Sequence, residues 1–228
     1  MAKILITSGP TRQYLDPVRY LTNASSGRMG AALAAACIER GHEVVIVSGP
    51  VAVTYPVSAT VIPVVTTDEM LAAASQQFTG CDVAIGAAAP CDYQPQQVAS
   101  QKIAKTGQPL TIELIETRDV VATLGQSKRP DQRVIGFALE TDDRRFRAIV
   151  KLEKKHCDLI VSNGPDAIDS TDNQVEILAA DGTLVEAIAG SKESVADRII
   201  EVIFRRLGLQ VPVSTHTRSE TASNRDQP

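Results

Sequence analysis

Apolar residues recur along the chain in two alternating patterns. Short unbroken apolar runs at Lys3–Thr7 and His42–Val47 are typical of buried strands. Between them, Met29–Glu39 is rich in alanine and has helical periodicity, and Gly41 follows as a helix stop. The first fifty residues therefore predict a strand, a helix and a second strand that runs parallel to the first.

The same alternation continues to residue 161. The pattern predicts further strands and helices in turn: Val61–Val65, a helix from Thr67 or Asp68 to Phe78, Asp82–Ile85, Thr111–Ile115, a helix at Asp119–Gly125, Arg133–Ala138, a helix at Asp142–His156, and Asp158–Val161. Parallel strands that are joined by crossover helices form an open α/β sheet.

The last part of the chain has a different pattern. Asp181-Gly182 separates two apolar runs, Gln174–Leu178 and Thr183–Ala187, and is a hairpin signal. The sheet is therefore expected to gain antiparallel edge strands, and Lys192–Leu207 is expected to close the fold as an amphipathic helix. Residues 209–228 are too polar to bury an ordering surface. We expect a single domain at 1–208 and a disordered polar tail.

Composition excludes several classes of protein. The 228 residues include 43% hydrophobic and 22% charged residues, as in globular proteins. Basic and acidic residues number 23 and 27, so a broad surface for nucleic acid or anionic lipid is not expected. The 4% aromatic content leaves few side chains on which single-stranded nucleic acid stacks. Because the chain as a whole is slightly acidic, any site for an anion must be local.

Targeting and cysteine patterns indicate a cytoplasmic protein. The start, Met-Ala-Lys-Ile-Leu-Ile, lacks the features of a secretory signal, and the longest small-apolar stretch, Gly30–Ile38, is too short to span a bilayer. The cysteines form no C-x-x-C pair and are expected to be reduced and packed: Cys37, Cys81, Cys91 and Cys157.

Ligands of open α/β sheets bind beyond the carboxyl ends of the strands. The loops to inspect follow five strand ends: Thr7, Ile85, Ile115, Ala138 and Val161. The first of these loops contains neither G-x-G-x-x-G nor G-x-x-x-x-G-K-[ST], and no helix carries a Tyr-x-x-x-Lys pair. These absences argue against an NAD(P)-dependent reductase.

The first loop ends in Asn23–Gly30, at the start of a predicted helix. Hydroxyl groups, free backbone N–H groups and the helix dipole favour an anion at such a place. Ser25 and Ser26 fit equally well as ordinary helix N-caps. The spacing alone leaves both interpretations open.

Two further features concern positive charge. In the helix Asp142–His156, four basic residues follow one another on one face, which fits either phosphate binding or a solvated surface: Arg144, Arg147, Lys151 and Lys155. The polar segment Cys91–Pro109 carries Lys102 and Lys105, and is expected to be either a flap over a polyphosphate or a plain surface loop. No Ser/His/Asp or Cys/His arrangement supports a protein nucleophile.

Taken together, these segments resemble the phosphopantothenate–cysteine ligases of coenzyme A biosynthesis, over Lys3 to about Leu207. The resemblance rests on five blocks of sequence: ITSGPTRQYLDPVRYLTNASSGRMG, GHEVVIVSGPV, AAAPCDYQP with QKIAK, VIGFALET, and KKHCDLIVSN. It implies a Rossmann-like three-layer fold with helices on both faces of an open, mostly parallel sheet. Many bacterial members follow a flavin-dependent decarboxylase domain, whereas here a stand-alone ligase is expected.

The resemblance also implies a reaction and its partners. The carboxylate of 4'-phosphopantothenate attacks the α-phosphate of CTP and releases pyrophosphate, after which the amine of L-cysteine displaces CMP. Mg2+ is the expected cofactor, and the metal ligands are unknown. Members are typically homodimers, and a separate flavin-dependent decarboxylase acts in the pathway. A catalytically degenerate nucleotide-binding protein of the same fold is the alternative.

The resemblance assigns roles position by position. Asn23 is expected to contact the acyl intermediate, Arg19 to hold substrate phosphate or carboxylate, and Lys102 to meet the triphosphate. The remaining nucleotide-binding positions are Ala88, Ala89, Asp92, Arg118, Asp119, Val120, Phe137, Lys151 and Lys155. Two departures from the family pattern are Ala104, where many members have a lysine, and Glu116-Thr117-Arg118-Asp119, which replaces a more familiar Asn-Pro-Asp.

Overall fold

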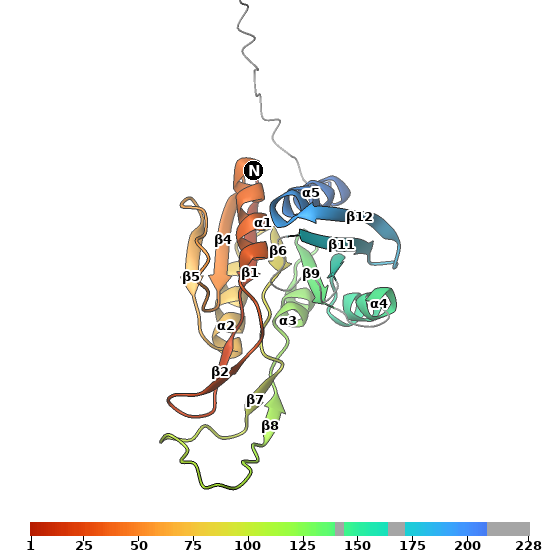
Figure 1. Ribbon diagram of the computed structural model, residues 1–228. Coiled ribbons are helices and arrows are strands. Elements are labelled where there is room, and N and C mark those ends of the chain that lie inside the picture. The colour runs from red at the N-terminus through yellow and green to blue at the C-terminus, as the bar shows by residue number, and fades with distance from the viewer. Residues whose placement is uncertain (140–143, 164–171, 209–228) are drawn as a thin grey trace, which may run out of the picture.

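The computed structural model describes residues 1–139, 144–163 and 172–208, and its centre is an eight-stranded sheet (Figure 1). The strand order is β12-β11-β10-β9-β6-β1-β4-β5. Six strands are parallel: β1 (Lys3–Ser8), β4 (Glu43–Ser48), β5 (Thr60–Pro63), β6 (Val83–Gly86), β9 (Arg133–Leu139) and β10 (Leu159–Asn163). The strands β11 (Asp172–Ala179) and β12 (Leu184–Ser191) form an antiparallel hairpin at one edge.

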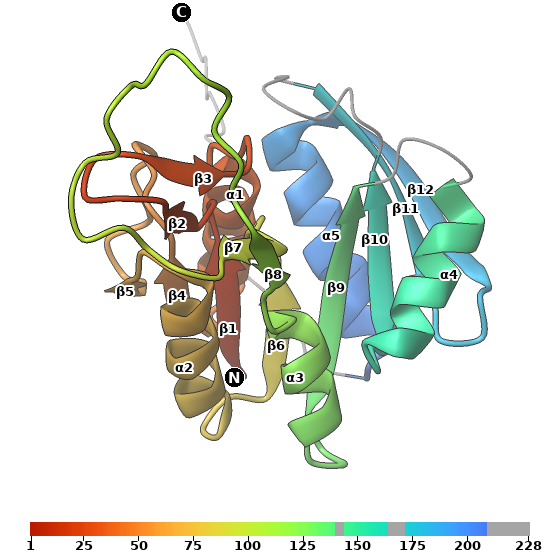
Figure 2. The same ribbon diagram turned by 90° about the horizontal axis from the view of Figure 1, so that it is seen from below.

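Helices cover both faces of this sheet. The helices α1 (Arg28–Glu39) and α5 (Lys192–Arg206) lie on one face, and α2 (Thr67–Phe78), α3 (Val120–Ser127) and α4 (Arg144–Lys154) lie on the other (Figures 1 and 2). Alternate residues of one strand enter different cores: Ile4 and Ile6 pack with α1 and α5, whereas Leu5 packs with α2 and α3. The predicted three-layer α/β fold with antiparallel edge strands is confirmed.

The strand order places a ligand site. The chain builds β4 and β5 on one side of β1, and then returns to build β6, β9 and β10 on the other side. The loops that leave β1 and β6 therefore diverge at the carboxyl edge of the sheet. In open α/β sheets this switch point is where ligands bind.

One strand prediction is wrong in place and in bounds. The expected strand Thr111–Ile115 is β8 (Leu114–Glu116), and it pairs with β7 (Tyr93–Pro95) in a separate two-stranded ribbon. A second ribbon, β2 (Arg12–Tyr14) with β3 (Tyr20–Thr22), lies inside the first loop, which was expected to be irregular. Strands of three residues leave too short an apolar pattern for detection.

These two ribbons and their connecting loops, residues 12–22 and 93–116, form what we call the arm. The arm projects from the carboxyl edge of the sheet (Figure 1), and Figure 2 shows the loop between β7 and β8 beside the β2–β3 ribbon. A backbone hydrogen bond from Ala99 N to Leu15 O joins the two parts at 3.0 Å. Residues 142–143 of the predicted helix and the predicted tail at 209–228 lie outside the described residues.

Two further expectations concern the cysteines and membrane-spanning helices. The four cysteines are buried and unpaired, and burial raises the pKa of Cys37 and of Cys157 to about 12. Such thiols are inert in ordinary conditions. Within residues 1–139, 144–163 and 172–208, none of the helices combines the length and the apolar character that a membrane crossing requires.

Candidate functional site

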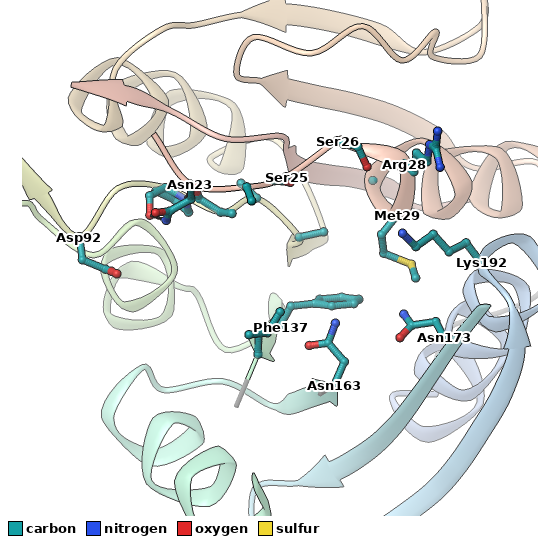
Figure 3. Close-up of a pocket in the computed structure, with 18 of the residues that line it drawn as sticks. Asn23, Ser25, Ser26, Arg28, Met29, Asp92, Phe137, Asn163, Asn173 and Lys192 are labelled. Carbon is teal, nitrogen blue, oxygen red and sulfur yellow. Dashed lines mark hydrogen bonds between the residues drawn. The ribbon is translucent and has the colours of Figure 1, made fainter. Parts of the chain in front are cut away.

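A cavity of about 500 Å³ lies at the carboxyl edge of the sheet, beside the switch point (Figure 3). Five groups of residues line it, from the first loop and α1, the segment after β6, the end of β9, α4 and β10, and the β11–α5 edge. In chain order these are residues 23–30, Ala87, Ala88, Ala89, Pro90, Asp92, Phe137, Leu139, Lys151, Asn163, Asn173 and Lys192.

The first turn of α1 forms one wall of this cavity. Its N-cap is Gly27, in the left-handed conformation at φ 75°, and no side chain caps the helix. Neither Ser25 nor Ser26 therefore serves as the N-cap. The uncapped backbone N–H groups of the first turn and the positive end of the helix dipole favour a bound anion here.

Close packing of β1 against α1 explains Gly30. A Cβ at this position would lie 2.1 Å from Ser8 Oγ, which would force the helix away from the strand. Ser8 Oγ donates to the carbonyl oxygen of Gly27 at 3.3 Å, and the Tyr55 hydroxyl donates to Ser8 Oγ at 2.9 Å. These contacts fix the start of α1 relative to the end of β1.

The segment after β6 is fixed by a buried hydrogen-bond network. Ala89 N donates to Gly9 O at 2.9 Å, which extends the pairing of the central strands. Cys91 N donates to Thr11 Oγ1 at 2.8 Å, and Thr117 Oγ1 donates to Cys91 O at 2.7 Å. The wall that carries Ala88, Ala89 and Asp92 is therefore held by the sheet on one side and by threonine hydroxyls on the other.

Asn23 is attached to that same wall. Its Nδ2 donates to Pro90 O at 2.9 Å and lies 3.4 Å from Ala89 O. The shorter contact orients the amide, and the longer one is a weak hydrogen bond. The Asn23 side chain consequently spans the mouth between the first loop and the β6 segment, as Figure 3 shows.

The opposite wall carries Phe137, Asn163 and Lys151. Phe137 on β9 lies beside Val161 on β10 in the sheet register, and its ring is half-buried in the cavity. Lys151 reaches the cavity from α4. Lys155, one turn later, forms an ion pair with Asp119 at 3.0 Å. The basic face of this helix thus divides between the cavity and an ion pair with the start of α3.

The remaining candidate residues do not line the cavity in the described part of the chain. Lys102 and Arg19 lie on the arm, where Lys102 is exposed and Arg19 pairs with Asp16 at 2.6 Å. Arg118 pairs with Asp68 at 3.2 Å on the surface. Asp119 caps α3 by accepting from Ala122 N at 2.9 Å, and Val120 is buried behind it.

Sequence reasoning missed the far end of the cavity. Asn173 on β11 and Lys192 at the start of α5 are both buried there, and Asn163 lies nearby (Figure 3). Among the described residues, the Oδ1 atom of Asn173 is buried without a hydrogen-bond partner. Asn163 closes a sequence block that was singled out, whereas Asn173 and Lys192 carry no local signal. Their place at the cavity follows only from the fold, because β11 and the start of α5 bring them there.

The charges around the cavity favour an anionic ligand. Of the described lining residues, Arg28, Lys151 and Lys192 are basic and Asp92 alone is acidic. Opposing cations in a partly enclosed site attract phosphate or carboxylate groups more strongly than the same charges in water. No cluster of three His, Cys, Asp or Glu side chains that could hold a metal occurs within the described residues.

Two known proteins are similar to most of this chain. The coenzyme A biosynthesis bifunctional protein CoaBC of Haemophilus influenzae is 36% identical over 205 residues, which are 89% of this chain and 51% of that protein. CoaBC of Vibrio parahaemolyticus is 40% identical over 206 residues, which are 87% of this chain and 51% of that protein. The chain therefore spans about half the length of these relatives.

A solved structure locates the matching half. The crystal structure of the C-terminal domain of CoaBC superposes with a TM-score of 0.77 at 38% identity, and the match covers 92% of this chain and 97% of that one. The family model described as the DNA/pantothenate metabolism flavoprotein C-terminal domain matches residues 1–207. From these matches and the shared fold, the chain belongs to the DNA/pantothenate metabolism flavoprotein C-terminal domain family.

Proposed function

We propose that this protein ligates 4'-phosphopantothenate to L-cysteine in coenzyme A biosynthesis and uses CTP to activate the carboxylate. In the first step the carboxylate oxygen bonds to the α-phosphorus, and the bond from that phosphorus to pyrophosphate breaks. In the second step the cysteine nitrogen bonds to the acyl carbon and loses a proton, while CMP leaves. The product would then pass to a flavin-dependent decarboxylase.

One observation carries the proposal. The cavity brings together five residues that lie far apart in the sequence: Asn23, Ala88, Asp92, Phe137 and Lys151. All five match family positions that the resemblance assigns to the acyl intermediate or the nucleotide. Activation by nucleotidyl transfer needs orientation and positive charge rather than a protein nucleophile, and this cavity offers both.

Asn23 is proposed to stabilise the acyl group. Its hydrogen bond to Pro90 O orients the amide, and the weakly engaged second N–H of Nδ2 is the donor for an acyl oxygen. Such a donor contributes most when negative charge builds on that oxygen, as cysteine attacks. On the opposite wall, Lys151 and the first turn of α1 are proposed to hold the phosphate groups.

The residues present fit Mg2+ as an ion that arrives with the nucleotide. Mg2+ is usually held by one or two carboxylates together with substrate phosphates, and Asp92 is the acidic side chain among the described residues of this cavity. Bound there, Mg2+ would neutralise charge on the leaving pyrophosphate. Asp92 would orient the phosphates through the ion, and Lys102 would reach them from the arm.

A homodimer is proposed through the arm. Several large apolar side chains of the arm are exposed, namely Val18, Val98, Leu110, Leu114 and Ile115. Exposed apolar groups concentrated on one projecting element are typical of an interaction surface. Light scattering is expected to give twice the chain mass, and Leu114→Glu with Ile115→Lys is expected to give the monomer. A wild-type monomer would contradict the dimer.

Pyrophosphate release tests the reaction. Purified protein with Mg2+ and 4'-phosphopantothenate should release pyrophosphate with CTP, and more of it when L-cysteine is present to turn the acyl intermediate over. ATP is the matched comparison. We expect Asn23→Asp, which keeps the size but replaces the N–H donor, to lower kcat by about 10²- to 10³-fold.

The outcomes separate the alternatives. CTP that binds without pyrophosphate release, with both co-substrates present, would point to the degenerate nucleotide-binding protein. Activity in the Asn23→Asp variant equal to the wild type would remove Asn23 from the chemistry while the ligase assignment stands.

A further inference from the structure

The arm carries a buried carboxylate that the proposed reaction does not use. Asp16 lies in the turn between β2 and β3, and its side chain is fully buried. A carboxylate in such a place must be compensated by hydrogen bonds and opposite charge. The groups that compensate the buried negative charge of Asp16 show which parts of the arm this side chain holds.

One oxygen of Asp16 builds the turn itself. Oδ1 accepts from Val18 N and from Arg19 N, both at 2.8 Å, and Pro17 restricts the backbone between Asp16 and Val18. The turn is closed by Leu15 N, which donates to Arg19 O at 2.8 Å. These are the contacts of an Asx turn, and an asparagine in place of Asp16 would preserve them.

The other oxygen reaches the second part of the arm. Oδ2 accepts from Ile103 N at 3.1 Å and from Arg19 Nε at 2.9 Å. Arg19 Nη2 in turn donates to Ile103 O at 2.5 Å. Both backbone groups of Ile103 are therefore held by one ion pair, whose partners lie 84 and 87 residues earlier in the chain.

The contacts of Asp16 and Arg19 with Ile103 lie next to Lys102 in the chain. Ile103 is held by Asp16 and Arg19, and Ala99 N donates to Leu15 O at 3.0 Å, so the backbone is anchored on both sides of Lys102. The Lys102 side chain itself is exposed. The backbone beside this lysine is thus fixed, while its ammonium group stays available to a ligand.

We propose that Asp16 is a positioning residue which, through Arg19 and the backbone of Ile103, presents Lys102 to the nucleotide. The inference rests on the proposed function, because it takes the ligand of Lys102 to be the CTP triphosphate. It gives Arg19 a task in holding the arm, in addition to the substrate contact that the resemblance implies. Asp16 touches no substrate and acts only through its neighbours.

Backbone amide exchange of the full chain tests whether Asp16 and Arg19 hold the backbone around Ile103. Asp16→Asn keeps the acceptor of the turn but turns an amide N–H toward Ile103 N and Arg19. Exchange across residues 99–105 is expected to rise roughly 10- to 100-fold, as the loss of a charge-assisted hydrogen bond predicts. Arg12→Lys is the control, because Arg12 lies on the same ribbon and stacks on Tyr20, with its guanidinium carbon 4.5 Å from the ring centroid. Unchanged exchange in Asp16→Asn would overturn the proposal.

A double-mutant cycle tests the positioning role. CTP affinity, measured with Mg2+ by calorimetry, is expected to fall about tenfold in Asp16→Asn and to fall no further when Lys102→Ala is already present. Arg19→Lys, which keeps the charge but not the fork, should give a smaller loss. An equal loss from Asp16→Asn in both backgrounds would mean a merely structural role and would overturn the proposal.

The two proposals fail in different ways. Faster exchange at 99–105 with unchanged CTP affinity would overturn the positioning role and leave the ligase assignment intact. A wild-type protein that binds neither CTP nor ATP would overturn both the proposed function and the positioning role.

Discussion

The cavity wall and the arm differ in what holds their candidate residues in position. At the cavity, Asn23, Ala89 and Phe137 lie at strand ends or are tied directly to them, so the parallel sheet sets their positions. On the arm, Lys102 lies in a long loop outside the main sheet, and its neighbours are placed by side-chain contacts from Asp16 and Arg19. The sheet supplies rigidity in one region, whereas an ion pair and a few hydrogen bonds between the two parts of the arm supply it in the other.

This difference suits the two kinds of ligand in the proposed reaction, a carboxylate that must be oriented and a nucleotide that must enter and leave. Strand ends hold groups within tenths of an ångström, which suits orientation of a reacting carboxylate. A ribbon held by one ion pair and a few hydrogen bonds opens at lower cost than a strand of the main sheet, which suits entry and release of a large nucleotide. We therefore expect substitutions in the wall to affect folding and chemistry, and those on the arm to affect nucleotide affinity.

The largest effect is expected from a glycine beside the cavity wall. A Cβ on Gly49 would lie 1.6 Å from Pro10 O, a backbone atom that cannot move aside without shifting the first loop. Gly49→Ala should therefore cost about 3 kcal/mol or more of unfolding free energy, or roughly 6 °C or more in melting temperature.

The matched change on the arm is Gly107→Ala. Gly107 has φ 76° but no neighbouring atom within 4 Å of an added Cβ. Only the left-handed conformation is penalised, at about 1 kcal/mol. Equal losses in melting temperature from the two substitutions would contradict the contrast between wall and arm.

The next effect separates two lysines of α4. Lys151 lines the cavity, whereas Lys155 pairs with Asp119. Lys151→Ala should raise the KM for the nucleotide about tenfold or more, as expected when a charge-assisted hydrogen bond to phosphate is lost. Lys155→Ala should raise it by about threefold or less, since a partly exposed ion pair contributes little. The reverse order would place the triphosphate over the start of α3.

A smaller effect concerns pH, and it distinguishes the main sheet with its covering helices, which we call the body, from the arm. His42 is buried and stacks on Phe204, with ring centroids 4.3 Å apart. Burial, together with the charges of the N-terminus and Arg40, lowers its pKa below 6.5. The unfolded chain takes up this proton at higher pH than the folded one, so unfolding free energy falls as pH drops below about 6.5. Melting temperature should decrease from pH 7.5 to 5.5, and less so in His42→Gln.

The arm should not follow that decrease. Burial alone would raise the pKa of Asp16, but hydrogen bonds from Val18, Ile103 and Arg19 outweigh it and hold the pKa well below its usual value. The carboxylate stays ionised across this range, and its contribution to stability is lost only in stronger acid. Exchange across residues 99–105, corrected for intrinsic rates, should therefore be equal at pH 7.5 and 5.5. Faster exchange at pH 5.5 would contradict the Asp16 assignment.

The smallest effect is expected at the surface between the two regions. Arg118 and Asp68 form an ion pair at 3.2 Å, with 72% and 50% of the side chains exposed. Arg118→Ala should change unfolding free energy by about 0.5 kcal/mol or less, because solvent screens such pairs. A large rise in nucleotide KM in this variant would show instead that Arg118 contacts the nucleotide, as the resemblance predicts.

The periodic pattern was sufficient for the body and insufficient for the arm. Buried strands such as Lys3–Ser8 and the helices between them leave repeats long enough to detect. The ribbons of the arm span only three residues per strand and mix buried with exposed positions, so their pairing left no comparable pattern. Asp16 was overlooked for the same reason: its partner Ile103 is 87 residues away, and no local spacing reveals it.

The sequence by itself determined the α/β class, the carboxyl ends of the strands as the place of a ligand site, and the motifs that carry Asn23 and Phe137. Local periodicity sets the helices and strands, and the family resemblance rests on short motifs. Only the tertiary structure decided that Lys151 faces the cavity while Lys155 pairs with Asp119, and that Asn173 and Lys192 close its far end. Those outcomes depend on how a helix rotates against the sheet and where an edge hairpin folds back. Packing between distant segments fixes both.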